Sequence, residues 1–203
     1  MQNQGDRRVD PHRGRDLRSK NRRRLRQILL QRCYLKGRFR LASGATSNLY
    51  FDCKRATLDP EGIGLVADLM LDLVADLKAA GKSIEAVGGP SIGADPIAAG
   101  MALRSYQRGC PLPAFLLRSA VKDHGTARLM ENDIPEGSPV LLVEDVVTSG
   151  GSALAAAETL AHSGYQVAAV ACVVDRQQGG AAALAPHRLH ALFTRADLEE
   201  SRS

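Results

Sequence analysis

The residues most able to do chemistry form one segment, Glu144-Asp145-Val146-Val147-Thr148-Ser149-Gly150-Gly151-Ser152. A turn of small residues that ends in Ser at the start of a helix exposes backbone N–H groups and hydroxyls in one concavity, and the helix dipole favours an anion there. No Lys follows the glycines, so the segment is not a P-loop. It indicates a phosphate site of another kind.

Two adjacent carboxylates, Glu144 and Asp145, come directly before this turn. They would repel a polyphosphate, but they can accept hydrogen bonds from neighbouring hydroxyls. The ligand implied has a phosphate at one end and a diol beside it, which describes ribose 5-phosphate. The alternative is an ordinary strand, turn and helix whose carboxylates are only solvated.

The elements around this segment alternate between strand and helix, as in a parallel sheet covered by helices. In open α/β sheets, ligands bind beyond the carboxyl ends of the strands, so this segment should lie at the functional edge. The run 167–174 is almost free of polar residues and should be buried on both faces of the sheet. We expect strands at 84–87, 113–117, 140–143 and 167–174, and helices at 60–80, 94–106 and 152–162.

The length of 203 residues fits one domain, and the composition is that of a soluble protein with no apolar run long enough to span a membrane. The net charge of +5 is uneven, because residues 1–26 hold nine Arg and Lys20 against three Asp, a local charge of +7. These residues contain no aromatic ring for stacking on bases, and no apolar run of a secretion signal follows them. We therefore expect residues 1–24 to be a basic, disordered tail and nucleic-acid binding to be unimportant.

The four cysteines, Cys33, Cys53, Cys110 and Cys172, are scattered, and no His stands at metal-ligand spacing. This spacing supports neither a zinc site nor a disulfide framework. Reduced thiols in a cytoplasmic protein account for them.

The segment that begins at Glu144 resembles the phosphoribosyl pyrophosphate (PRPP) signature of type I phosphoribosyltransferases. Three further segments resemble orotate phosphoribosyltransferases, and together the matches cover most of residues 25–200 in the expected order. They are the base-binding segment with Leu41-Ala42-Ser43-Gly44, Tyr50-Phe51-Asp52 and Thr57-Leu58-Asp59-Pro60, the catalytic loop with Arg118 and Lys122-Asp123-His124-Gly125, and the stretch Val174-Asp175-Arg176-Gln177-Gln178-Gly179-Gly180.

This resemblance implies an α/β fold with a central, mostly parallel sheet flanked by helices, and a small N-terminal hood for the base, in a domain of residues 25–203. It also implies transfer of ribose 5-phosphate from PRPP to orotate, with Mg²⁺ carried by PRPP and no direct metal ligand from the protein. The working unit would be a homodimer that shares the loop around Lys122 and His124 between subunits.

The resemblance also assigns roles to individual residues. Lys122, His124 and Asp145 would be catalytic, since donors such as Lys122 and His124 can neutralise the departing pyrophosphate and their loop can exclude water. Arg176 would form a bidentate pair with the orotate carboxylate, although an ion pair with Asp175 is an alternative. PRPP would contact Arg118, Gly89, Pro90, Glu144, Asp145, Val146, Val147, Thr148, Ser149, Gly150, Gly151 and Ser152, and orotate would contact Arg176, Thr148, Tyr50 and Phe51.

The chain departs from the family at two positions that are often Lys, where it has Ala42 and Ser119. Lys54 or Arg55 could replace the first missing charge. These departures keep two alternatives open: a phosphoribosyltransferase for another nucleobase, and a non-catalytic PRPP-binding regulator whose basic tail binds nucleic acid.

Overall fold

The computed structural model describes residues 11–40, 46–118, 130–185 and 187–200, and leaves the side chains at 11–13, 36 and 38–50 undescribed. A six-stranded sheet forms its centre, in the order β5-β4-β3-β6-β7-β8. Neighbouring strands are parallel except for the pair β4 and β5. The strands are β3 (Ala86–Pro90), β4 (Ala114–Leu117), β5 (Met130–Glu131), β6 (Pro139–Val147), β7 (Gln166–Asp175) and β8 (Leu189–Thr194).

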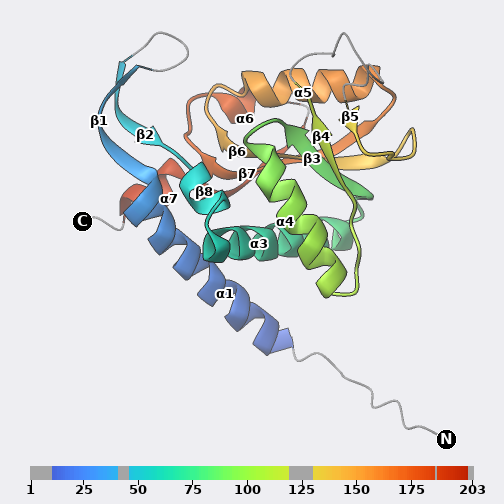
Figure 1. Ribbon diagram of the computed structural model, residues 1–203, viewed down its shortest axis with the longest axis horizontal. Coiled ribbons are helices and arrows are strands. Elements are labelled where there is room, and N and C mark those ends of the chain that lie inside the picture. The colour runs from blue at the N-terminus through green and yellow to red at the C-terminus, as the bar shows by residue number, and fades with distance from the viewer. Residues whose placement is uncertain (1–10, 41–45, 119–129, 186, 201–203) are drawn as a thin grey trace, which may run out of the picture.

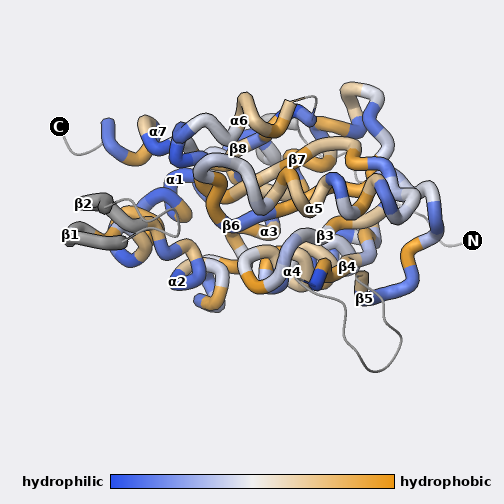
Figure 2. The backbone as a smooth tube through the Cα atoms, turned by 90° about the horizontal axis from the view of Figure 1, so that it is seen from above, coloured by the Kyte–Doolittle hydropathy of each residue, from blue (hydrophilic) through white to orange (hydrophobic). Residues whose placement is uncertain are grey.

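Helices cover both faces of the sheet, as Figure 1 shows. On β6, Leu141 and Val143 pack into the core beneath α3 (Pro60–Ala79) and α4 (Ala94–Gln107), whereas Val140 and Leu142 pack into the core beneath α5 (Gly151–His162). Successive strand residues point to opposite faces, so an apolar run buried on both sides is the pattern of a central parallel strand. Figure 2 shows the hydrophobic residues of β6 and β7 that form this pattern.

The order of the strands places a topological switch between β3 and β6. From β3 the chain crosses through α4 to β4 on one side, and from β6 it crosses through α5 to β7 on the other. The loops that follow β3 and β6 therefore diverge at neighbouring strand ends, and open α/β sheets bind ligands in the crevice at such a point.

The start of α3 shows how local sequence fixes a boundary. The Asp59 side chain accepts hydrogen bonds from the backbone N–H groups of Glu61 and Gly62, and Pro60 occupies the first turn. At the other end, Gly81 adopts a φ of +86°, which an L side chain rarely tolerates. The expected helix at 60–80 is therefore confirmed within one residue.

The expectation of a disordered tail over residues 1–24 is wrong for the part that the structure describes. Residues Pro11–Ile28 form α1, followed by one π-helical turn, η1 (Leu29–Cys33). Leu25 and Ile28 of α1 are buried in the same core as α3. Arginine contacts on the polar faces also fasten the helix, since Arg18 pairs with Asp76 at 2.7 Å and Arg24 pairs with Glu61 at 2.6 Å.

A second, two-stranded antiparallel sheet lies beside the main one and projects from it in Figure 1. It consists of β1 (Tyr34–Arg40) and β2 (Thr46–Phe51), and the short helix α2 (Lys54–Thr57) leads from it into α3. This hairpin and the mostly parallel sheet together confirm the expected fold class. The chain ends with α6 (Gly180–Ala183), β8 and α7 (Arg195–Glu199).

Two strands extend further at their carboxyl ends than expected. β3 begins at Ala86 and continues through Gly88 and Gly89 to Pro90, beyond the expected end at residue 87. No side chain fits at either glycine, because an added Cβ would lie about 2 Å from the carbonyl oxygen of Phe115 or of Val143. β6 continues to Val147, so Glu144 and Asp145 lie within the strand and not beyond it, since β7 pairs with β6 as far as Asp175.

Of the helices that the structure describes, none combines the length and the apolar character needed to cross a membrane. The four cysteines are free thiols.

Candidate active site

The acidic pair, Glu144 and Asp145, lies at the topological switch. Both residues are buried, each 7% exposed. The loop after β3 approaches them closely, because a Cβ added at Gly93 would lie 2.5 Å from Oδ1 of Asp145 and 2.7 Å from Oε1 of Glu144. Glycine at position 93 thus leaves the two carboxylates room at the mouth of the crevice.

Each carboxylate of the acidic pair has two described hydrogen bonds. Glu144 Oε1 accepts from the backbone N of Asp145 at 3.3 Å, and Oε2 accepts from Ser152 Oγ at 3.1 Å. Asp145 Oδ1 accepts from the backbone N of Val146 at 2.8 Å, and Oδ2 accepts from Lys54 Nζ at 3.3 Å. A carboxylate has about four lone-pair sites, so both can still accept hydrogen bonds from a ligand's hydroxyls.

Burial, and after it the negative charge of Asp145, raise the pKa of Glu144 to about 7. Hydrogen bonds from Ser152 and from the backbone of Asp145 act in the opposite direction. Two carboxylates this close do not ionise equally readily, so the pair can hold a proton near neutral pH.

Residues 148–152 form the turn that follows the acidic pair and leads into α5. Gly150 is the N-cap of the helix, with a φ of +84°, and provides no side chain to satisfy the first N–H groups. Ser149, Gly151 and Ser152 are exposed. The amides at the start of this 12-residue helix therefore face an open surface at the positive end of the helix dipole, as a phosphate site requires.

The turn at residues 148–152 is supported from below by the start of α6. A Cβ added at Gly180 would lie 2.4 Å from Cγ1 of Val147 and 2.7 Å from the carbonyl oxygen of Thr148. Val147 itself is buried, and its carbonyl accepts from the backbone N of Arg176 at 2.9 Å. Val147, which the resemblance placed among the PRPP contacts, is thus a packing residue beneath the turn.

Comparison with known proteins identifies the family to which this arrangement belongs. Residues 58–187 match the family model described as the phosphoribosyl transferase domain. An orotate phosphoribosyltransferase of Sorangium cellulosum is 43% identical over 165 residues, which cover 80% of this chain and 84% of that protein. The chain belongs to the orotate phosphoribosyltransferase family.

Solved structures agree with this membership of the orotate phosphoribosyltransferase family. The orotate phosphoribosyltransferase of Mycobacterium tuberculosis in complex with Fe(III) dicitrate superposes with a TM-score of 0.76 at 36% identity, covering 88% of this chain and 99% of that one. The structure of the same enzyme in complex with PRPP gives a TM-score of 0.72 at 33% identity, covering 88% and 98%.

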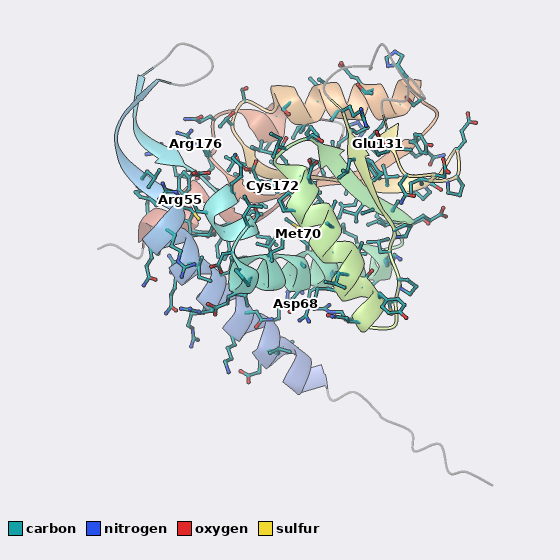
Figure 3. The ribbon with its side chains drawn as sticks, viewed as in Figure 1. Arg55, Asp68, Met70, Glu131, Cys172 and Arg176 are labelled. Atoms are coloured by element: carbon teal, nitrogen blue, oxygen red, sulfur yellow. The ribbon has the colours of Figure 1, made fainter. Side chains whose placement is uncertain are left out.

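Within this orotate phosphoribosyltransferase fold, Arg176 follows β7 on the side of the sheet that faces the β1–β2 hairpin, as Figure 3 shows. Its side chain is 4% exposed. The carboxylate of the preceding residue, Asp175, accepts from the backbone N of Gln177 at 2.7 Å. Arg176 thus directly follows β7, which pairs with β6, the strand of the acidic pair. Its position is beside the turn at residues 148–152.

Gly89 and Pro90, which were expected to contact PRPP, lie at the end of β3 and have packing roles there. Gly89 is buried within β3, where its missing side chain admits the carbonyl of Val143. Pro90 ends the strand, and the next backbone N–H, that of Ser91, donates to the carbonyl of Leu117 at 3.0 Å. The residue of this loop that approaches the acidic pair is Gly93.

The remaining family positions are less fully described. Arg118 follows β4 and forms an ion pair with Glu131 of β5, at the end of the β4–β5 pairing whose strands flank the segment expected to be the catalytic loop. Lys122 and His124 of that loop lie outside the described residues, as does the side chain of Tyr50. Phe51 is 4% exposed and meets the Tyr34 ring edge-to-face, with centroids 5.0 Å apart, so it is a core residue that has little surface to offer to a base.

Sequence reasoning missed two features of the family site. The hydroxyl of Ser152 was assigned to phosphate, yet it donates to Glu144. Sequence reasoning did not single out Gly93. Its distance from the acidic pair in the structure shows why a side chain is excluded at this position. The sequence shows that residue 93 is a glycine, but only the structure shows that this position faces two carboxylates.

Proposed function

We propose that the chain catalyses orotate + PRPP ⇌ orotidine 5′-monophosphate + pyrophosphate, a step of pyrimidine nucleotide synthesis. The observation that carries this proposal is the acidic pair at the end of β6, followed directly by the helix-capping turn at residues 148–152. This order offers acceptors for a ribose diol and donors for a 5′-phosphate within one crevice.

In the proposed reaction, the bond between the anomeric carbon and pyrophosphate breaks, and a ring nitrogen of orotate bonds to that carbon and loses its proton, which the released pyrophosphate takes up. Glu144 and Asp145 hold the ribose hydroxyls, and the amides of residues 148–152 hold the 5′-phosphate. A cation-like ribosyl centre develops next to these carboxylates, where their negative charge stabilises it. Holding both ends of the sugar phosphate fixes the anomeric carbon for attack.

We assign neutralisation of the negative charge on the leaving pyrophosphate to the loop after β4. Lys122 and His124 donate to it, with Arg118 at the base of the loop, and closure of the loop excludes water that would otherwise attack the sugar. We propose that this loop serves the neighbouring subunit of a homodimer. Orotate is held by Arg176, Thr148 and Tyr50, while Phe51 supports the hairpin from the core.

Mg²⁺ fits this site through the substrate. In the described part of the chain, His, Cys, Asp and Glu form no group of three or more that could hold a metal ion. Mg²⁺ typically binds one or two carboxylates together with substrate phosphates and water. Mg²⁺ would thus be carried by PRPP with no direct ligand from the protein, and the ion would supply positive charge to the leaving pyrophosphate. We place the reaction in the cytoplasm.

The test is to incubate the full chain with Mg²⁺, PRPP and one base at a time from orotate, uracil, adenine, guanine and hypoxanthine, and to follow consumption of the base and release of pyrophosphate. We expect orotate alone to be consumed rapidly. Consumption of another base in its place would make the chain a different phosphoribosyltransferase. Binding of PRPP with no turnover of any base would make it a non-catalytic PRPP-binding protein.

A further inference from the structure

A lysine from outside the strand carrying the acidic pair reaches that pair. Lys54 is the first residue of α2, and its Nζ lies 3.3 Å from Oδ2 of Asp145, 91 residues further along the chain. The Asp145 side chain is 10% exposed, whereas that of Lys54 is 44% exposed. The ammonium group therefore lies at the boundary between the buried carboxylate and the open crevice.

The backbone that carries Lys54 is firmly packed. Cys53 and Ala56, on either side of it, are completely buried. α2 also lies directly against the start of α3, because a Cβ added at Gly62 would lie 2.2 Å from the carbonyl oxygen of Ala56. The backbone at Lys54 is thus held in place by packing, so the contact with Asp145 costs little backbone conformational entropy.

Lys54 and Ser152 have matching positions around the acidic pair. Ser152 Oγ donates to Oε2 of Glu144, and Lys54 Nζ donates to Oδ2 of Asp145. The other oxygen of each carboxylate accepts from the main chain. The terminal torsion of Asp is broad, so two contacts are needed to fix the plane of its carboxylate.

We infer that Lys54 is a positioning residue of the ribose subsite, which orients the Asp145 carboxylate and offsets its charge when a sugar phosphate enters. The inference rests on the proposed function. Two adjacent carboxylates repel an incoming phosphate ester, and a cation on the outer side of Asp145 reduces this repulsion.

The neighbouring arginine does not share this geometry. Arg55 Nε lies 3.3 Å from Oδ2 of Asp52, three residues earlier in the chain. Figure 3 shows Arg55 near the base of the hairpin. Arg55 thus provides a matched control, since its loss removes the same charge from the same helix without removing the contact with Asp145.

The experiment compares the full-length wild type with Lys54→Met, Lys54→Arg and Arg55→Met. Titration calorimetry with ribose 5-phosphate, without any base, measures the ribose subsite independently of turnover, and steady-state kinetics give KM for PRPP and for orotate. We expect Lys54→Met to weaken ribose 5-phosphate binding and raise KM for PRPP by about tenfold, the size of one charge-assisted hydrogen bond, with KM for orotate within about twofold. Lys54→Arg should restore most of the loss, and Arg55→Met should stay within about twofold of wild type.

The inference is overturned if Lys54→Met binds ribose 5-phosphate as the wild type does. It is also overturned if Arg55→Met loses as much affinity, because the effect would then be general charge and not the contact with Asp145. A fall in melting temperature of Lys54→Met with equal rises in both KM values would reduce Lys54 to a structural ion pair and overturn it too. A wild type that binds ribose 5-phosphate but turns over no base would defeat the proposed function and leave the binding comparison decisive for Lys54.

Discussion

Ser152 Oγ donates to Oε2 of Glu144 at 3.1 Å, and this contact joins the first turn of α5 to the carboxyl end of β6. One side chain thereby connects the two parts of the proposed site, the acidic pair that we assign to the ribose diol and the turn that we assign to the phosphate. The distance between these parts is set by the strand and helix, and not by a flexible loop. A rigid sugar phosphate can therefore be held at both ends without reorganisation of the site.

Replacing Gly93 with Ala should damage the site while leaving the fold intact. The added Cβ would lie within 2.7 Å of one carboxylate oxygen from each member of the acidic pair, so both side chains would have to turn away. We expect kcat/KM for PRPP to fall by about tenfold or more, since small misplacements at a reacting centre are costly.

The matched control for Gly93→Ala is Gly64→Ala in α3, where an added Cβ meets nothing within 4 Å. This variant should keep full activity and gain about 0.5–1 kcal/mol in free energy of unfolding from its higher helix propensity. Steady-state kinetics and urea denaturation measure both variants. Unchanged kinetics in Gly93→Ala would mean that the acidic pair has no part in turnover.

Glu144 should make stability depend on pH. Because its pKa is about 7 in the folded chain and lower when unfolded, the folded chain binds more protons at intermediate pH, and the free energy of unfolding falls as pH rises towards 7. Glu144→Gln cannot ionise, so it should match the wild type at pH 5 and exceed it in melting temperature at pH 8. The control is Glu158→Gln, which removes an exposed carboxylate from α5, measured at the same two pH values. If the difference in melting temperature between Glu144→Gln and the wild type were the same at pH 5 and pH 8, this result would contradict the raised pKa of Glu144.

Arg176→Ala should weaken the binding of a carboxylated base selectively. Loss of a buried bidentate partner should raise KM for orotate by about 100-fold while KM for PRPP changes less than about threefold. Arg195→Ala removes an exposed arginine that pairs with Glu199 of the same helix at 2.8 Å, and it should leave both constants unchanged. If Arg176→Ala raised both constants equally, recognition of the orotate carboxylate by this residue would be excluded.

Leu25→Ala should destabilise the whole domain, because α1 is part of its core. Leu25 is completely buried, and truncating a buried Leu typically costs about 2–5 kcal/mol. Leu17 on the same helix is 58% exposed, so Leu17→Ala should cost less than about 0.5 kcal/mol. Urea denaturation measures both. Equal stability of the two variants would show that α1 is not integrated into the domain.

The sequence predicted the elements whose own residues define them. α3 has an apolar stripe, a capping Asp59 and a terminating Gly81, and all three signals are local. α1 lacks such a stripe. It is held by contacts with residues far along the chain, such as Arg26 with the carbonyl of Asp197 and the Arg22 guanidinium over the Phe193 ring at 4.5 Å. No local pattern reveals such contacts, and the many arginines were therefore interpreted as solvated.

The same distinction applies to the site. The order of Glu144, Asp145 and the small residues that follow predicted both a phosphate site and a diol site. The burial of the acidic pair, the raised pKa of Glu144 and the contact with Lys54 come from the way β3, β6 and α2 meet in space. Lys54 lies 91 positions from Asp145 and Gly93 lies about 50 positions from Glu144, so only folding brings these residues to the acidic pair.

The most direct test of the account is a crystal structure of the full chain with Mg²⁺ and PRPP. The account predicts the 5′-phosphate on the backbone amides of residues 148–152 and the ribose hydroxyls within hydrogen-bonding distance of Glu144 and Asp145. A 5′-phosphate bound away from the start of α5, or a ribose that contacts neither carboxylate, would contradict it.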